Sequence, residues 1–109
     1  DKLKQILLNL LLNACQEMIE GGVITITTEP EQEVFSISVS DQGNGIDMKN
    51  IDRIFEPFYT TKKNGTGLGL AIVKQLVESM NGTISVQSGS SGSQFTIRIP
   101  YEVKKHIDR

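Results

Sequence analysis

The sequence predicts an α+β fold, a two-layer sandwich in which a mixed β-sheet carries its helices on one face. Apolar residues recur at helical spacing in two stretches, residues 2–20 and about 67–80. Each stretch is followed by two short runs in which β-branched or aromatic residues alternate with polar ones, the pattern of a β-hairpin. The predicted order is therefore helix, two strands, a long loop, helix and two strands.

The composition indicates one globular domain. Hydrophobic residues make up 38% of the 109 residues and charged residues 22%, which suits a single core. The net charge of -2 argues against binding nucleic acid through a basic surface. A single cysteine fits a reducing compartment, and no apolar run is long enough to span a bilayer, so we expect a cytoplasmic domain. Because a helix pattern starts at the first residues, we expect a piece of a longer protein, whose attachment to a membrane stays open.

The first helix, over residues 2–20, is apolar over most of its circumference, so we expect it to be largely buried. Asn9 and Asn13 interrupt this apolar surface one turn apart, on one face. Asparagine is a poor residue inside a helix, and a buried amide needs a partner. A solvent-facing stripe is the alternative, and it suits Gln5 and Gln16. For the two asparagines we favour a shared polar ligand.

The first hairpin has predicted strands at residues 23–28 and 34–40, joined by residues 30–33. In its second strand apolar residues alternate with serines, so the apolar set forms the core face. Asp41 continues the alternation, which directs its carboxylate to the core side, where an unpartnered charge is costly. The alternative is an aspartate that caps its own turn.

The loop over residues 46–66 has no clear periodicity, although residues 47–54 could form a short helix capped by Asp47. A loop this long in a compact domain is usually functional or disordered. Its apolar half contains Phe55 and Phe58, which we expect to pin the loop to the core. Its basic end contains Lys62, for which a solvated charge is the alternative interpretation.

Three glycines at spacing two, Gly65, Gly67 and Gly69, lead into the second helix, and Thr66 is its predicted N-cap. Glycine permits close approach of a ligand, and the N–H groups of a helix start favour a phosphate. An ordinary turn with a helix cap is the alternative. The Walker phosphate loop, the dinucleotide-binding fingerprint and the signatures of hydroxyl kinases are all absent from the sequence.

The second hairpin, with strands at residues 83–88 and 93–99, closes a predicted domain of residues 1–100. Residues 101–109 form a polar tail that contains the single histidine, His106. A Ser-His-Asp arrangement or a metal cluster of cysteine and histidine is therefore not credible.

Five motifs, taken together and in order, resemble the catalytic ATP-binding domain of sensor histidine kinases, in the superfamily of gyrase, mismatch-repair and chaperone ATPases. The resemblance runs from Leu3 to Pro100. The motifs are the N box at residues 9–14, the first glycine box at 41–46, the F box at 55–58, the second glycine box at 65–70, and a last motif at 92–95, where the family more often has Gly-Thr.

The resemblance implies a Bergerat-type ATP-binding fold with Mg-ATP bound under an ATP lid, residues 46–66. Asn13 would coordinate Mg²⁺ through its amide oxygen, and Asn9 would assist at the phosphates or the metal. Asp41 would accept a hydrogen bond from the adenine amino group, and Lys62 is the candidate lid cation, which would make Asn9, Asn13 and Lys62 the catalytic set. The implied nucleotide contacts are completed by Gly43, Gly45, Ile46, Phe55, Phe58, Gly65, Thr66, Gly67, Leu68, Gly69, Leu70 and Ser93.

The chain departs from the family pattern in its first helix. Gln16 and Glu17 stand where many members carry a basic and an aromatic residue, so a phosphate contact and an adenine-side contact from this helix stay open. From the resemblance we expect a strand before this helix, which would be missing or supplied elsewhere. The ATPases of the superfamily activate water with a glutamate at the position of Asn9. An amide cannot act as a base, so the resemblance favours phosphoryl transfer to histidine over hydrolysis.

The partners that the resemblance implies follow from this activity. The domain would phosphorylate a histidine on a separate dimerisation domain of its parent protein, in a two-component system with a response-regulator aspartate as the downstream acceptor. We expect the isolated domain to be monomeric and the parent to be a homodimer. The alternative is a regulatory or anti-sigma type domain that binds nucleotide and a partner protein. An upstream pair of helices with an exposed histidine would decide for the kinase.

Overall fold

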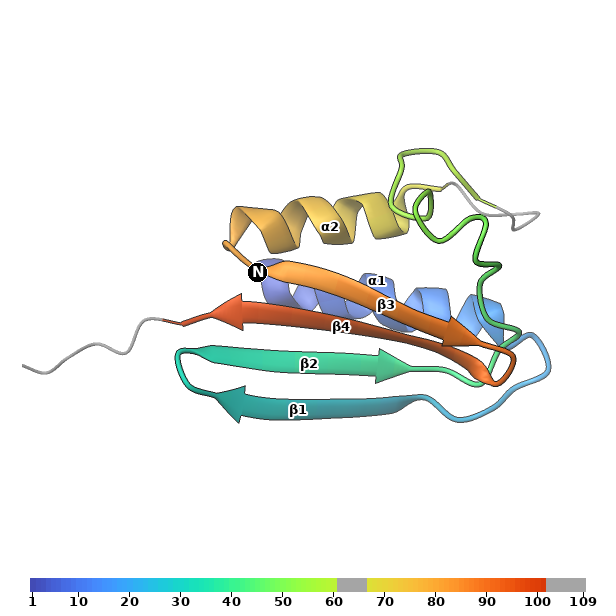
Figure 1. Ribbon diagram of the computed structural model, residues 1–109, viewed down its shortest axis with the longest axis horizontal. Coiled ribbons are helices and arrows are strands. Elements are labelled where there is room, and N and C mark those ends of the chain that lie inside the picture. The colour runs from blue at the N-terminus through green and yellow to red at the C-terminus, as the bar shows by residue number, and fades with distance from the viewer. Residues whose placement is uncertain (61–66, 102–109) are drawn as a thin grey trace, which may run out of the picture.

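A computed structural model describes residues 1–60 and 67–101 and shows two helices packed on one face of a four-stranded sheet (Figure 1). The predicted two-layer α+β fold is confirmed. The elements in chain order are α1 (Lys2–Glu17), β1 (Thr25–Glu31), β2 (Val34–Ser40), α2 (Gly69–Ser79), β3 (Thr83–Gly89) and β4 (Gly92–Pro100).

The sheet has the strand order β1-β2-β4-β3, and each pair of neighbours among these strands is antiparallel, which differs from the mixed sheet that we expected. The connection through α2 makes β3 run in the same direction as β2. However, β4 lies between these two strands, so they do not pair. A parallel crossover between strands that are not neighbours is therefore compatible with an antiparallel sheet.

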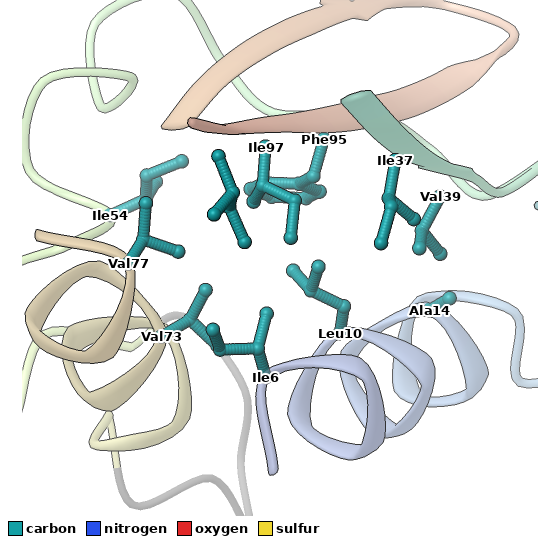
Figure 2. Packing of buried hydrophobic residues seen from close by; sticks show 11 residues of the cluster. Ile6, Leu10, Ala14, Ile37, Val39, Ile54, Val73, Val77, Phe95 and Ile97 are labelled. Atoms are coloured by element: carbon teal, nitrogen blue, oxygen red, sulfur yellow. The ribbon is translucent and has the colours of Figure 1, made fainter. Parts of the chain in front are cut away.

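The core lies between the helices and the sheet, with one stripe from each helix facing the strands (Figure 2). The apolar alternation predicted for β2 is confirmed in its second half, because Ile37 and Val39 are buried while Ser38 and Ser40 are not; earlier in the strand Ser36 is buried and Phe35 is half-buried. The buried hydrophobic residues are Ile6, Leu10, Ala14, Ile37, Val39, Ile54, Val73, Val77, Phe95, Ile97 and Ile99.

The first helix is shorter and less buried than expected. It ends at Glu17 with Met18 as its C-cap, before the predicted end at residue 20. Its second apolar side stays open, because Leu8 is 54% exposed and Leu12 is 51% exposed. A helix on a sheet with one neighbouring helix buries one stripe, so apolar residues around the remaining circumference are not covered by the described residues.

The β1–β2 connection is tighter than predicted. Pro30 belongs to β1 and pairs with Phe35, so the turn consists of residues 32–33. Proline fits this position because β1 is at the edge of the described sheet. Tyr101, assigned to the tail from the sequence, is bonded to this hairpin, since its hydroxyl donates to the Glu31 carbonyl at 2.9 Å.

The second helix begins at Gly69, and Leu68 occupies the N-cap position without a side-chain cap bond. The prediction that Thr66 caps this helix is therefore wrong. Residues 47–54 form successive turns and no helix, although Asp47 does accept a hydrogen bond from the Lys49 N–H at 3.0 Å. No helix in the described part of the chain is both long and apolar enough to cross a membrane.

Candidate functional site

The elements that carry the described site residues come together at one end of the sandwich, where β2 ends and β3 turns into β4 (Figure 1). The C-terminal end of α1, the N-terminal end of α2 and the loop after β2 meet at this same end. They enclose a cavity of about 190 Å³. Its lining residues are Asn13, Glu17, Gly45, Ile46, Asp47, Asn50, Ile54, Tyr59, Thr60, Leu70 and Ser93.

The carboxylate of Asp41 is buried, as the alternation along β2 predicted, with 7% of the residue exposed. Its Oδ1 accepts hydrogen bonds from the N–H of Gly43 at 2.9 Å and from the N–H of Ser93 at 3.3 Å. Asp41 therefore caps its own turn, as the alternative interpretation predicted, and its carboxylate also bonds this turn to β4 through the Ser93 N–H. Because both N–H groups reach Oδ1, Oδ2 is the oxygen that this arrangement leaves to accept from a ligand.

A pair of serine hydroxyls lies beside this carboxylate, at the end of the second hairpin. Ser93 is 4% exposed, and its Oγ lies 2.9 Å from the Oγ of Ser88. The N–H of Ile46 donates to Ser88 Oγ at 2.5 Å. Ser93 lines both the main cavity and an adjoining, more open hollow that Asp41 and Ser88 line.

Ser88 was not among the residues predicted for the site. A signal for it was present, because Ser88 follows Ile84 and Val86 in the same alternation of β3. This is the pattern that singled out Asp41 after Val39 on β2. A hydroxyl is a weaker indication than a carboxylate, since a half-buried serine is common at the end of a strand.

Two glycines of the predicted boxes allow close packing between distant segments. Gly45 has φ +79°, and a Cβ at its position would lie 2.1 Å from the carbonyl oxygen of Gly89. Gly67 has φ +75°, and a Cβ there would lie 2.4 Å from the carbonyl carbon of Phe58. Side chains at such positions would be both strained and obstructed. Gly45 thus lets the loop after β2 pack closely against the second hairpin. Gly67 lets the segment before α2 pack closely against Phe58 of the lid.

The two asparagines of α1 lie beside the start of α2. Asn9 and Asn13 are half-buried, and Asn13 lines the cavity. The Oδ1 of Asn9 is 3.9 Å from the point that a Cβ on Gly69 would occupy. Leu70, in the first turn of α2, lines the cavity with Asn13. The N box and the second glycine box are therefore adjacent in space.

The lid is anchored by other side chains than predicted. Phe55 packs edge-on against Phe95, with ring centroids 6.3 Å apart, which agrees with the prediction. Phe58 is 74% exposed, so the prediction that its side chain pins the lid to the core is wrong. Its contribution comes from the backbone, because its N–H donates to the Gly67 carbonyl at 2.9 Å. Ile54, which is 8% exposed, supplies the buried anchor that the sequence did not single out.

Tyr59, which was also missed, lines the cavity, and Arg53 lies over its ring at 4.6 Å from the centroid. Three of the predicted site residues, Lys62, Gly65 and Thr66, lie outside the described residues.

Two helices over one face of an antiparallel sheet, with the cavity at one end, is the architecture of histidine kinase catalytic domains. The catalytic domain of the histidine kinase ThkA, in a nucleotide-free form, matches with a TM-score of 0.83 and 38% identity, over 91% of this chain and 66% of that chain. The full-length kinase ShkA in complex with AMPPNP matches with a TM-score of 0.81 and 36% identity, over 91% of this chain and 21% of that chain.

The family model for histidine kinase-, DNA gyrase B- and HSP90-like ATPases matches residues 1–103. The chain belongs to this family, as a catalytic ATP-binding domain of the sensor histidine kinase type, which confirms the resemblance drawn from the five motifs.

Curated relatives point to the same class. The sensor histidine kinase ZraS of Escherichia coli strain K12 is 46% identical over 106 residues, which are 96% of this chain and 23% of that kinase. Sporulation kinase C of Bacillus subtilis is 38% identical over 101 residues, covering 92% of this chain and 24% of that kinase. The chain thus spans about a quarter of the length of these relatives.

Proposed function

We propose that this domain binds Mg-ATP and transfers the γ-phosphoryl group to a histidine on a separate dimerisation domain of its parent protein. The observation that carries the proposal is the presence of two chemically different groups of residues around the cavity. Ser93, which lines the cavity, and Asp41, which lines the adjoining hollow with it, form one end, suited to a base. Asn9, Asn13 and the first turn of α2 form the other end, suited to phosphates.

At the base end, Asp41 offers a carboxylate oxygen and Ser93 a hydroxyl, both fixed by bonds to the surrounding backbone. An acceptor that is buried and held in place suits the amino group of adenine. The apolar side of a base would meet Ile46 and Ile54, which line the same cavity. Such a mix of a few fixed polar groups with apolar walls is usual in ligand pockets.

At the phosphate end, the first turn of α2 brings backbone N–H groups that have no partner within the helix. Together with the positive end of the helix dipole they favour a phosphate. The proximity of Asn9 to Gly69 places an amide beside this turn. Lys62, proposed as a cation of the lid, would add charge neutralisation, and this role matters more because Gln16 supplies no positive charge.

The residues present fit a magnesium ion. The amide oxygen of Asn13 is a hard ligand, and Mg²⁺ is commonly held by one or two protein oxygens, substrate phosphates and water. The described residues contain no cluster of three or more carboxylate, histidine or cysteine ligands, so the nucleotide phosphates would supply much of the coordination. When bound, the ion would neutralise charge on the phosphates during transfer.

The reaction is a substitution at the γ-phosphorus. A nitrogen of the acceptor imidazole forms the new P–N bond, the bond from phosphorus to the bridging oxygen breaks, and ADP leaves. The second ring nitrogen loses its proton to solvent or a nearby base. A neutral imidazole needs no strong base, so positioning and charge neutralisation suffice. Asn9, an amide, cannot activate water, and we therefore expect slow hydrolysis.

The proposal also concerns what lies beyond this chain. The parent would be a homodimer through its dimerisation domain, with this domain monomeric in isolation, and a response-regulator aspartate would receive the phosphoryl group. The domain would work in the cytoplasm, whether or not its parent is anchored in a membrane. The exposed free thiol of Cys15 suits this reducing environment. Half-exposed Leu8 and Leu12 suit a covering segment of the parent, such as the strand expected before α1.

The test is to mix this chain and ATP labelled at the γ position with candidate histidine-bearing dimerisation domains. We expect an acid-labile label on the acceptor that requires both Mg²⁺ and the acceptor histidine. An acid-stable label on a serine of a partner would support the regulatory class of domain instead. Hydrolysis by the isolated chain as fast as transfer would contradict the role proposed for Asn9.

A further inference from the structure

Ser88 lies between the lid and the base end of the cavity without lining the main cavity itself. Its Oγ accepts the hydrogen bond of the Ile46 N–H at 2.5 Å and lies 2.9 Å from Ser93 Oγ. A backbone N–H can only donate, so the role of Ser88 in the first contact is fixed as acceptor. The role in the second contact depends on which serine carries the bridging proton.

An N–H that donates to a hydroxyl oxygen strengthens the bond that the same hydroxyl donates onward. Donation from Ser88 to Ser93 therefore makes a continuous chain, from the Ile46 N–H through Ser88 to Ser93. In this direction the proton of Ser93 is not used by Ser88. Ser93 lines the main cavity, so its O–H is then available to donate to a ligand there.

We propose that Ser88 is a positioning residue that makes the Ser93 hydroxyl a donor toward the base and so sets the preference for adenine. The inference rests on the proposed binding of ATP at this site. The Ser93 N–H bond to Asp41 keeps this donor next to the carboxylate acceptor. Adenine has a matching edge, where a ring nitrogen that accepts adjoins an amino group that donates. Guanine has a carbonyl oxygen in place of that amino group and meets the carboxylate with a second acceptor.

The packing around Ser88 supports a fixed relay. A Cβ on Gly45 would lie 3.0 Å from Ser88 Oγ and 2.1 Å from the Gly89 carbonyl oxygen, so the loop that carries Ile46 is in close contact with the end of β3. The same hairpin holds Asp41, because a Cβ on Gly92 would lie 2.0 Å from the Asp41 carbonyl oxygen. Donor and acceptor thus belong to segments that cannot separate independently.

The experiment measures nucleotide affinity of this chain by calorimetry with ATP, GTP, 1-deaza-ATP and 7-deaza-ATP, each in the presence of Mg²⁺. The two deaza analogues each lack one ring nitrogen that flanks the amino group. The variants are Ser88→Ala, Ser88→Cys, which keeps the shape with a weak thiol donor, and Ser88→Thr, which keeps the hydroxyl. Ser90→Ala, in the exposed turn of the same hairpin, is the matched control.

We expect Ser88→Ala and Ser88→Cys to weaken ATP binding about threefold to tenfold, the usual range for one hydrogen bond, and to reduce the preference over GTP. For the deaza analogue that lacks the ring nitrogen facing Ser93, these two variants should bind as tightly as the unchanged chain does. Ser88→Thr should retain the preference, and Ser90→Ala should match the unchanged chain.

An equal loss for ATP and both analogues would overturn the relay, because it would show a general disturbance of the pocket. Loss of the preference in Ser88→Thr, which retains the hydroxyl, would overturn it as well. If Ser88→Ala does not fold, the comparison of Ser88→Cys with Ser88→Thr still tests the relay. Failure of the unchanged chain to bind ATP would overturn the proposed function and the relay together. Normal ATP binding with a uniform effect of the variants would overturn the relay alone.

Discussion

The base end and the phosphate end of the cavity are built in different ways. At the base end, the N–H groups of Ile46 and Ser93 donate to side-chain oxygens from distant segments, and the N–H of Gly43 donates to Asp41 in its own turn. At the phosphate end, Leu68 occupies the N-cap position of α2, and its side chain makes no cap bond to the N–H groups of the helix. The chain therefore uses its donors at the base end to hold its own segments together, and offers donors to a ligand at the phosphate end.

In the function that we propose, this difference separates recognition of the base from transfer of the phosphoryl group. A base that binds to groups already held in place loses little ordering entropy, which favours selectivity. Phosphates would bind at the helix start together with a metal ion. We therefore expect changes at the base end to alter stability and nucleotide preference, and changes at the phosphate end to alter Mg²⁺-dependent affinity at nearly unchanged stability.

The largest expected effect is that of Gly45→Ala, at the base end. The new Cβ would meet the Gly89 carbonyl oxygen at 2.1 Å in a residue with φ +79°. We expect the free energy of unfolding to fall by about 3 kcal/mol or more, since a forced positive φ and a backbone clash add. Chemical denaturation measures it. Gly89→Ala is the control, because a Cβ there would have no atom within 4 Å. Equal losses of the free energy of unfolding in the two variants would contradict the close packing that we assign to Gly45 at the base end.

Asn13→Ala tests the phosphate end. Losing a polar contact to a charged group costs about 1.5–3 kcal/mol, so ATP affinity in Mg²⁺ should fall about 10- to 100-fold. Calorimetry with Mg²⁺ and with a chelator measures the metal-dependent part. The free energy of unfolding should change less than in Gly45→Ala, since Asn13 is half-buried and lines the cavity. Gln5→Ala, on an exposed position of the same helix, is the control. Unchanged affinity with Mg²⁺ would remove Asn13 from the metal site.

Asp41→Asn tests the base end, because it distinguishes the roles of the two carboxylate oxygens. The amide oxygen can still accept from Gly43 and Ser93, while the amino group replaces the oxygen left for the ligand. We expect ATP affinity to fall about 10-fold and the preference over GTP to shrink, in line with the loss of one charge-assisted bond. Competition between the two nucleotides measures the ratio, and an unaltered ratio would contradict adenine recognition by Asp41.

The smallest expected effects concern the lid. Ile54→Val removes one methylene from an 8% exposed residue and should lower the free energy of unfolding by about 0.5–1.5 kcal/mol. Phe58→Leu changes a side chain that is 74% exposed and should stay within about 0.5 kcal/mol of the unchanged chain. Thermal unfolding of both variants measures these changes in the free energy of unfolding. A larger loss for Phe58→Leu would restore the aromatic anchor that the sequence suggested.

The sequence predicted the parts of the site that depend on alternation along one element. Asp41 follows the core face of β2, and its burial was foreseen because the period of a strand is two. Asn9 and Asn13 were paired by the helical repeat and do face the second glycine box. The five motifs, each weak alone, became specific through their order.

The remaining features depend on what other segments do, which one element cannot reveal. Leu8 and Leu12 have the same apolar character as buried Leu10, but the described residues do not cover them. Phe58 is exposed because its backbone, with φ +68°, lies against Gly67. Ser88 is bonded to Ile46, a residue 42 positions away, as well as to Ser93 in its own hairpin. Pairings at this distance follow from tertiary packing and carry no local signal.

The most direct test of the difference between the two ends is amide hydrogen exchange of this chain, resolved by residue, with and without Mg²⁺ and a non-hydrolysable ATP analogue. We predict that the N–H groups of Gly43, Ile46 and Ser93 are protected before nucleotide is added and gain little. The N–H groups of Gly69 and Leu70 should gain protection only with both Mg²⁺ and nucleotide. Equal gains at both ends, or rapid exchange of the base-end N–H groups in the free chain, would contradict the account.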